Sequence, residues 1–61
     1  MMTMAKSVFR VEEAAEYLSI SRAKAYELIQ HGKLRSVKID GSRRITLNQL
    51  EAYIHRLKAA P

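Results

Sequence analysis

The sequence contains no cysteine, which excludes disulfide bonds and thiolate ligands for a metal. Its two histidines, His31 and His55, are too few to form a zinc site without cysteines, and no carboxylate spacing completes one. We therefore expect no metal and no cofactor. The absence of cysteine also fits a reducing compartment, and we expect a cytoplasmic protein.

Features of an enzyme are missing as well. Glycine occurs only twice, and no glycine-rich loop for binding phosphates is present. A chain this short has little room for a substrate pocket, and none of its serines has an evident histidine partner. We expect no catalytic residue and no enzymatic activity.

Long apolar segments are also absent. No stretch approaches the roughly 20 apolar residues of a membrane-spanning helix, and the N-terminus has no apolar run of signal-peptide length. A peptide that binds the membrane surface would need a basic amphipathic face, whereas the first predicted helix is acidic. We expect a soluble protein with no membrane partner.

Positive charge is the main feature that the composition does show. Eleven Lys and Arg residues stand against six Asp and Glu residues, which gives a formal net charge of +5 in 61 residues. A basic surface of this size attracts polyanions, nucleic acid first. Apolar residues make up 48% of the chain, enough for one small core. We expect a flexible tail at 1–7, one domain at 8–58 and a frayed end at 59–61.

The first part of this domain has the pattern of a helix, a turn and a second helix. Residues 11–18 place apolar side chains at i, i+3, i+4 and i+7, which is one face of a helix. Arg10 stands at its N-cap position, although arginine has no oxygen that accepts a hydrogen bond. We expect Ser21 to cap the second helix, 22–30, and Gly32 to end it in a left-handed conformation.

The next segment changes from helical to alternating periodicity. Residues 33–39, with the alternating pair Val37 and Ile39, predict a short strand. Asp40-Gly41 is a strong hairpin signal, and 43–46 predict the return strand with Ile45 pointing inward. Thr46 and Gln49 then fit a capping box that begins a third helix. The expected fold class is mainly α with a small two-stranded β-hairpin, arranged as a winged helix-turn-helix.

Several segments in this order carry a recognisable pattern. They are VEEAAEYLSISR (11–22), AYELIQHGKL (25–34), the two hairpin arms Lys38-Ile39 and Arg44-Ile45, and LEAYI (50–54). Together they resemble the excisionase family, whose DNA-binding domains are MerR-like. Members are small phage, plasmid and transposon proteins that bind DNA near attachment sites and steer a recombinase toward excision. Arg10 departs from the Thr or Ser usual in that family, which either weakens the helix start or adds a contact to the DNA backbone.

The second helix is the expected reader of DNA, because N-terminal residues of such a helix reach base edges in the major groove. Arg22 would bind a guanine edge or hold a phosphate, and Glu27 would accept from a cytosine or pair with a nearby cation. The Tyr26 ring would either belong to the core with an outward hydroxyl or, as the resemblance implies, lie at the DNA backbone. We expect a part-buried ring with its hydroxyl on a phosphate. The full expected set is Ser21, Arg22, Ala23, Lys24, Tyr26, Glu27 and Gln30.

The hairpin is the second expected contact with DNA. Its cations would enter the minor groove or clamp the phosphates beside it. The alternative is an ordinary solvated edge strand, on which Lys and Arg discourage strand pairing. The expected wing contacts are Lys38, Ser42, Arg43 and Arg44.

The function indicated is that of a sequence-specific architectural protein that binds and bends attachment-site DNA and assists an integrase. A small transcriptional repressor, or a protein-docking module of a recombination or packaging complex, remains open as an alternative. An exposed apolar patch at Tyr53 or Leu57 would mark the docking module. Partners are double-stranded DNA, an integrase or other recombinase, and neighbouring copies of the chain on DNA. We expect a monomer in free solution, since no heptad segment follows the third helix.

Overall fold

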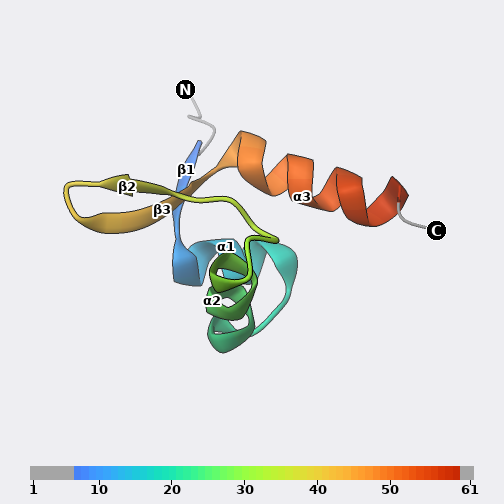
Figure 1. The fold of residues 1–61 in the computed structure, drawn as a ribbon, viewed down its shortest axis with the longest axis horizontal. Coiled ribbons are helices and arrows are strands. Elements are labelled where there is room, and N and C mark those ends of the chain that lie inside the picture. The colour runs from blue at the N-terminus through green and yellow to red at the C-terminus, as the bar shows by residue number, and fades with distance from the viewer. Residues whose placement is uncertain (1–6, 60–61) are drawn as a thin grey trace, which may run out of the picture.

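The protein is described here by a computed structural model that covers residues 7–59. The order of elements confirms the predicted winged helix-turn-helix fold class (Figure 1). Most of the expected tail and frayed end, at 1–6 and 60–61, lies outside the described residues. The elements are β1 (Val8–Arg10), α1 (Val11–Leu18), α2 (Arg22–Gln30), β2 (Val37–Ile39), β3 (Ser42–Thr46) and α3 (Leu47–Ala59).

The core is made of α1 and α2 on one side of the sheet, closed by single residues from the later elements. Ala14 and Ala25, one on each helix, have no exposed surface, and their small side chains let the two helices approach closely. Leu34, Ile45 and Leu50 are the largest fully buried side chains. They come from the loop after α2, from β3 and from α3, so these three segments each contribute one anchor to the core.

Local capping fixes both helices of the helix-turn-helix, and the sequence predicts the caps of α2. The Lys24 N–H donates to Ser21 Oγ at 3.0 Å, and Gly32 follows α2 with a φ of +72°. Ser19 ends α1 with a φ of +59°, a left-handed conformation that glycine adopts more readily. At the N-terminus of α1 the capping group is the Glu13 side chain, one turn into the helix. The Arg10 N–H donates to Glu13 Oε1 at 2.9 Å.

The sheet has three strands rather than the two that the sequence predicts. β1 pairs antiparallel with β3, so the order is β1-β3-β2 and β3 is the middle strand. Phe9 of β1 lies opposite Ile45, packs against the core, and meets the Tyr17 ring edge-on at 5.5 Å. Phe9 therefore anchors the N-terminal segment on the core. A hairpin alone is unstable, and β1 supplies the support that it needs at its base.

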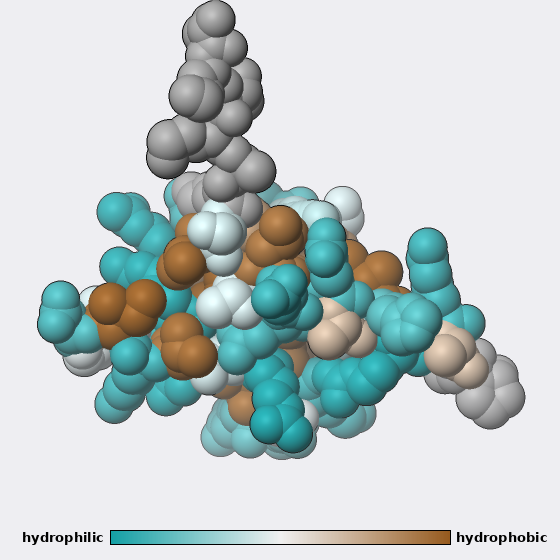
Figure 2. Space-filling view, turned by 90° about the horizontal axis from the view of Figure 1, so that it is seen from above, coloured by the Kyte–Doolittle hydropathy of each residue, from teal (hydrophilic) through white to brown (hydrophobic). Residues whose placement is uncertain are grey.

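The hairpin beyond this base projects away from the core. Asp40 and Gly41 have φ values of +51° and +80°, as a type I′ turn requires, which confirms the predicted turn. Val37 and Ile39 face away from the side of Ile45 and are 37% and 46% exposed. Figure 2 shows apolar surface over the hairpin, interrupted by polar side chains.

Helix α3 begins at the predicted capping box and then leaves the core. The Thr46 N–H donates to Gln49 Oε1 at 3.0 Å, and the Gln49 N–H donates to Thr46 Oγ1 at 3.1 Å. The helix points away from the hairpin in Figure 1, and its only buried residue is Leu50. Within residues 7–59, no helix is both long and apolar enough to span a membrane.

Replacing Ala15 with leucine should test the close approach of α1 and α2. Ala15 is 3% exposed, and extra carbons there have no free space to enter. We expect a loss of about 1–3 kcal/mol in the free energy of unfolding, the usual cost of overpacking. Urea denaturation followed by circular dichroism measures it, and Ala23→Leu on the exposed side of α2 is the control. Equal stability of the two variants would contradict this helix packing.

Candidate nucleic-acid interface

The N-terminus and exposed side of α2 carry all the residues that the sequence predicts as the DNA contacts of this helix. Ser21 caps the helix, and the six others follow it along an exposed surface. The buried side of the helix holds Ala25 and Leu28. The fold therefore presents this set together, at one end and one side of a single helix.

Arg22 does not extend freely from the helix. Its guanidinium lies 3.8 Å from the Glu12 carboxylate of α1 and 5.6 Å from the centre of the Tyr26 ring. Both contacts draw the side chain back along α2 instead of out beyond its N-terminus. Because both partners are well exposed, the ion pair is weak and a DNA phosphate can displace the carboxylate.

Glu27 pairs with a nearby cation, which is one of the two roles expected for it. Its carboxylate lies 4.0 Å from Lys24 Nζ, one helical turn away on an exposed surface. Such a pair contributes only a few tenths of a kcal/mol. Tyr26 is 44% exposed, so a large part of its ring is available at the surface between α2 and the hairpin.

The wing arginines point to opposite sides of the sheet. Arg43 pairs with Lys38 and shares the face of Ile45, whereas Arg44 pairs with Val37 on the opposite face. The Arg44 guanidinium donates to the Arg43 carbonyl oxygen at 3.1 Å. Arg43 and Lys38 therefore belong to the face that looks toward α2, which the sequence alone does not distinguish from the other.

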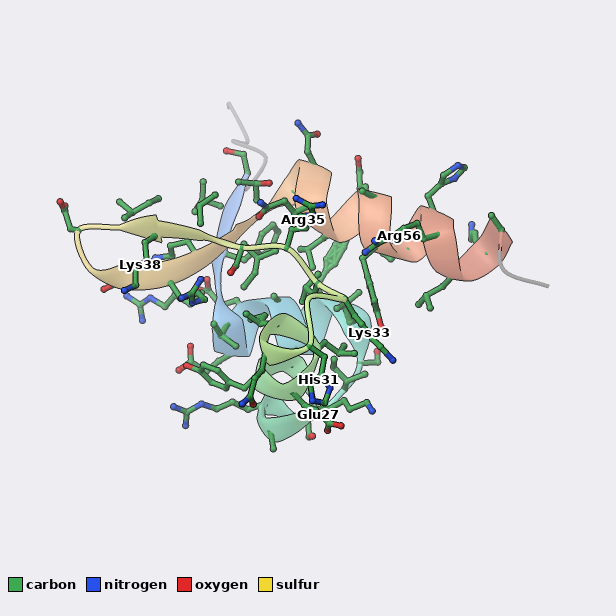
Figure 3. The ribbon with its side chains drawn as sticks, viewed as in Figure 1. Glu27, His31, Lys33, Arg35, Lys38 and Arg56 are labelled. Atoms are coloured by element: carbon green, nitrogen blue, oxygen red, sulfur yellow. The ribbon has the colours of Figure 1, made fainter. Side chains whose placement is uncertain are left out.

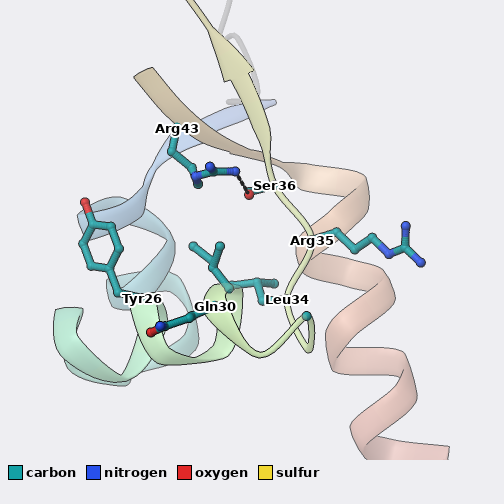
Figure 4. A pocket seen from close by; sticks show the side chains of 8 residues that line it. Tyr26, Gln30, Leu34, Arg35, Ser36 and Arg43 are labelled. Carbon is teal, nitrogen blue, oxygen red and sulfur yellow. Dashed lines mark hydrogen bonds between the residues drawn. The ribbon is translucent and has the colours of Figure 1, made fainter. Parts of the chain in front are cut away.

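A groove of about 680 Å³ separates α2 from the hairpin (Figure 4). Ile29 and Leu34 line its apolar part, and Tyr26, Gln30 and Arg43 line its polar part. The Arg43 guanidinium donates to Ser36 Oγ at 2.9 Å, across the base of the hairpin. The groove thus joins residues of the recognition helix and the wing in one surface.

A second hollow, of about 260 Å³, continues this surface toward α1. Tyr26 and Arg43 line both hollows, and Arg10 and Arg44 line the second. Arg10 lies directly opposite Arg44 in the β1–β3 pair, and like charges in such positions repel each other. A bound anion would relieve that repulsion.

Sequence reasoning left Arg10, Arg35 and Ser36 out of the expected contact set. Arg10 had been noted as a possible backbone contact, but only strand pairing places it beside Arg44. Arg35 lines the groove, and Ser36 holds Arg43. Figure 3 shows Lys38 on the hairpin, and Lys33 and Arg56 beside α3 at the other side of the molecule.

Metal-binding groups do not gather near this surface. Among residues 7–59, no three His, Cys, Asp or Glu side chains lie close enough together to hold a metal ion. The chemistry that the surface offers is that of cations, hydroxyls and one amide around a groove. These groups bind phosphates and base edges.

An exposed polar recognition helix beside a basic hairpin defines a winged helix-turn-helix domain. Residues 8–58 match the family model described as "Helix-turn-helix domain". The chain is 35% identical over 54 residues to an excisionase of Streptomyces ambofaciens, covering 88% of this chain and 87% of that protein. It is 43% identical over 49 residues to a probable excisionase of Saccharopolyspora erythraea, covering 80% of this chain and 50% of that protein.

These relationships confirm the resemblance seen in the sequence. The chain belongs to the excisionase family of helix-turn-helix DNA-binding proteins. No solved structure matches it significantly.

Proposed function

We propose that the chain binds attachment-site DNA of a mobile element, bends it, and assists an integrase in excision. The main support for DNA binding is the groove that Tyr26 and Gln30 of α2 line together with Arg43 of the hairpin. A duplex that contacts both elements gives sequence-dependent contacts to α2 and phosphate contacts to the wing. The protein would act by binding alone.

Bending follows from the shape and charge of this surface. The hairpin projects from the core, so α2 and the wing form two walls of a concave face. Cations line the base of the wing on both sides of the sheet, at Arg43 and at the Arg10–Arg44 pair. Bending would bring the duplex onto more of these groups, and the added phosphate contacts would offset the energy of bending it.

The second half of α3 is the proposed contact with the integrase. Tyr53 packs against the core, but Leu57 is 57% exposed at the end of the helix that points away from the hairpin. This exposed leucine is one of the two residues expected to mark a docking surface. An integrase bound there would not compete with DNA for α2 or the groove.

The direct test is an excision reaction with the element's own integrase and attachment sites, with and without the protein. We expect footprints beside the attachment site and excision only when the protein is present. In circular-permutation gels, the bent complex should migrate more slowly with the site at the centre of the fragment than with the site at its end. Leu57→Asp should keep the footprint and lose excision. A footprint over a promoter with no effect on excision would favour the transcriptional repressor instead.

Replacing Arg22 with alanine should separate base reading from phosphate binding. If Arg22 leaves Glu12 to bind a guanine edge, its loss should cost about 1–3 kcal/mol on the specific site and much less on random DNA. Fluorescence anisotropy with both duplexes measures this difference. An equal loss on both duplexes would assign Arg22 to a phosphate, and Lys58→Ala on α3 is the charge-matched control.

A further inference from the structure

The Arg43 side chain of the hairpin is held by a hydrogen bond to a side chain of another segment. Its guanidinium reaches back from β3 to the hydroxyl of Ser36, in the loop before β2, at 2.9 Å (Figure 4). The bond turns Arg43 away from the tip at Asp40-Gly41 and toward the groove beside α2. Ser36 itself is half-buried, so its own position is fixed by the fold.

The acceptor that holds Arg43 carries no charge. Arg22, by comparison, is held by the carboxylate of Glu12, which cancels part of its charge. Among residues 7–59, Arg43 forms no ion pair with a carboxylate. One of its five N–H donors is used by Ser36, and the others remain for a ligand. Arg43 is thus oriented and still fully charged.

The groove beside Arg43 has the character of a site for one sugar-phosphate strand. Ile29, which is half-buried, and the exposed part of the Tyr26 ring supply an apolar surface for a deoxyribose, while Gln30 and Arg43 stand at the polar part of the groove. A planar guanidinium pairs with two oxygens of a phosphate, which gives both attraction and orientation.

We propose that the groove between α2 and the hairpin binds one phosphodiester of the DNA backbone through Arg43, and that Ser36 is the positioning residue for Arg43. Arg43 then clamps a phosphate and does not enter the minor groove. The proposal rests on DNA binding by the helix-turn-helix and names the ligand of one part of that surface.

The contribution of Ser36 is pre-organisation. A free arginine must lose its rotamer freedom when it binds a phosphate, whereas a side chain already held by Ser36 has lost much of it beforehand. We expect Ser36→Ala to lower DNA affinity about 3- to 10-fold, and Arg43→Ala by at least as much. The double variant should lose no more than Arg43→Ala, because Ser36 acts only through Arg43.

The experiment uses the full chain and a duplex selected by the wild-type protein from a random-sequence pool. Affinities are measured by fluorescence anisotropy for Ser36→Ala, Arg43→Ala and the double variant. Ser36→Thr keeps the hydroxyl and should restore wild-type affinity. Ser7→Ala is the matched control, because within residues 7–59 the hydrogen bond of Ser7 is made by its backbone carbonyl, which accepts from the Leu47 N–H at 2.9 Å. Thermal unfolding of each variant checks that all are folded.

A second measurement identifies the bound group. Single phosphates of the duplex are replaced one at a time with uncharged methylphosphonates. At one position the replacement should weaken wild-type binding, and the same replacement should have no effect on Arg43→Ala. The proposal is wrong if two results are found together. The first is that no methylphosphonate position behaves in this way. The second is that exchanging A·T for G·C pairs under the wing changes affinity only when Arg43 is present, which would mean that Arg43 reads the minor groove.

Failure of this inference is distinguishable from failure of the proposed function. The role of Ser36 would be overturned if a folded Ser36→Ala variant bound DNA with wild-type affinity. It would also be overturned if the double variant bound DNA more weakly than Arg43→Ala. In both cases DNA binding by the chain would stand. Absence of binding by the wild-type chain to every duplex in the pool would overturn both.

Discussion

Replacing Arg43 and Arg44 together with alanine should lower DNA affinity about 10- to 100-fold at moderate salt and flatten its salt dependence. The two side chains lie on opposite faces of β3 and line the two connected hollows beside Tyr26. If each binds a phosphate, their loss should reduce the slope of log K against log salt by about 1.8. Anisotropy titrations at several salt concentrations measure both quantities.

The control for this variant removes the same charge elsewhere. Lys33 and Lys58 are exposed cations near α3 and on its last turn, away from the hairpin. Lys33→Ala combined with Lys58→Ala also removes two positive charges and should change the slope far less. If the two double variants have the same affinity and slope, only the total charge matters and the hairpin has no special role.

Replacing Leu34 with alanine should have the largest effect on stability. Leu34 is 1% exposed and packs where the loop after α2 meets the core, and its backbone N–H donates to the Leu28 carbonyl at 3.1 Å. A buried leucine truncated to alanine costs about 2–5 kcal/mol, whereas a domain of this size rarely has more than 3–5 kcal/mol in total. We expect the variant to be largely unfolded at 37 °C.

Urea denaturation at low temperature measures this loss where the variant still folds. Leu57→Ala is the control, because the same truncation at a side chain that is 57% exposed should cost well under 1 kcal/mol. Because DNA binds the folded chain and not the unfolded one, a saturating duplex should partly restore folding of Leu34→Ala. Similar stability of the two leucine variants would contradict the position of Leu34 in the core.

The features that the sequence predicts correctly are local ones. Helices α1 and α2, the Ser21 cap, the Asp40-Gly41 turn and the capping box at Thr46 all follow from residues within a few positions of one another. The strand β1 is different, since Val8 pairs with Thr46 across most of the chain. Its three residues also carry no alternating pattern long enough to indicate a strand.

The candidate site shows the same division. The exposed side of α2 is readable from helical periodicity, and the wing cations are readable from their place beside the turn. The ion pair between Arg22 and Glu12, and the bond from Arg43 to Ser36, depend on how separate elements pack. Whether an arginine is neutralised, free or held ready for a ligand is therefore a property of the fold, although the arginine itself is visible in the sequence.

The pairing of β1 with β3 also bears on the order of folding. Closing the long loop between Val8 and Thr46 costs chain entropy before any strand contact forms, whereas α1 and α2 are neighbours in sequence and can dock early. We expect the helix-turn-helix to form in the transition state and the sheet to follow it. Conservative truncations in the α1–α2 core should then slow folding, and truncations at Phe9 should mainly speed unfolding. Stopped-flow kinetics of both sets would reveal the opposite order if it held.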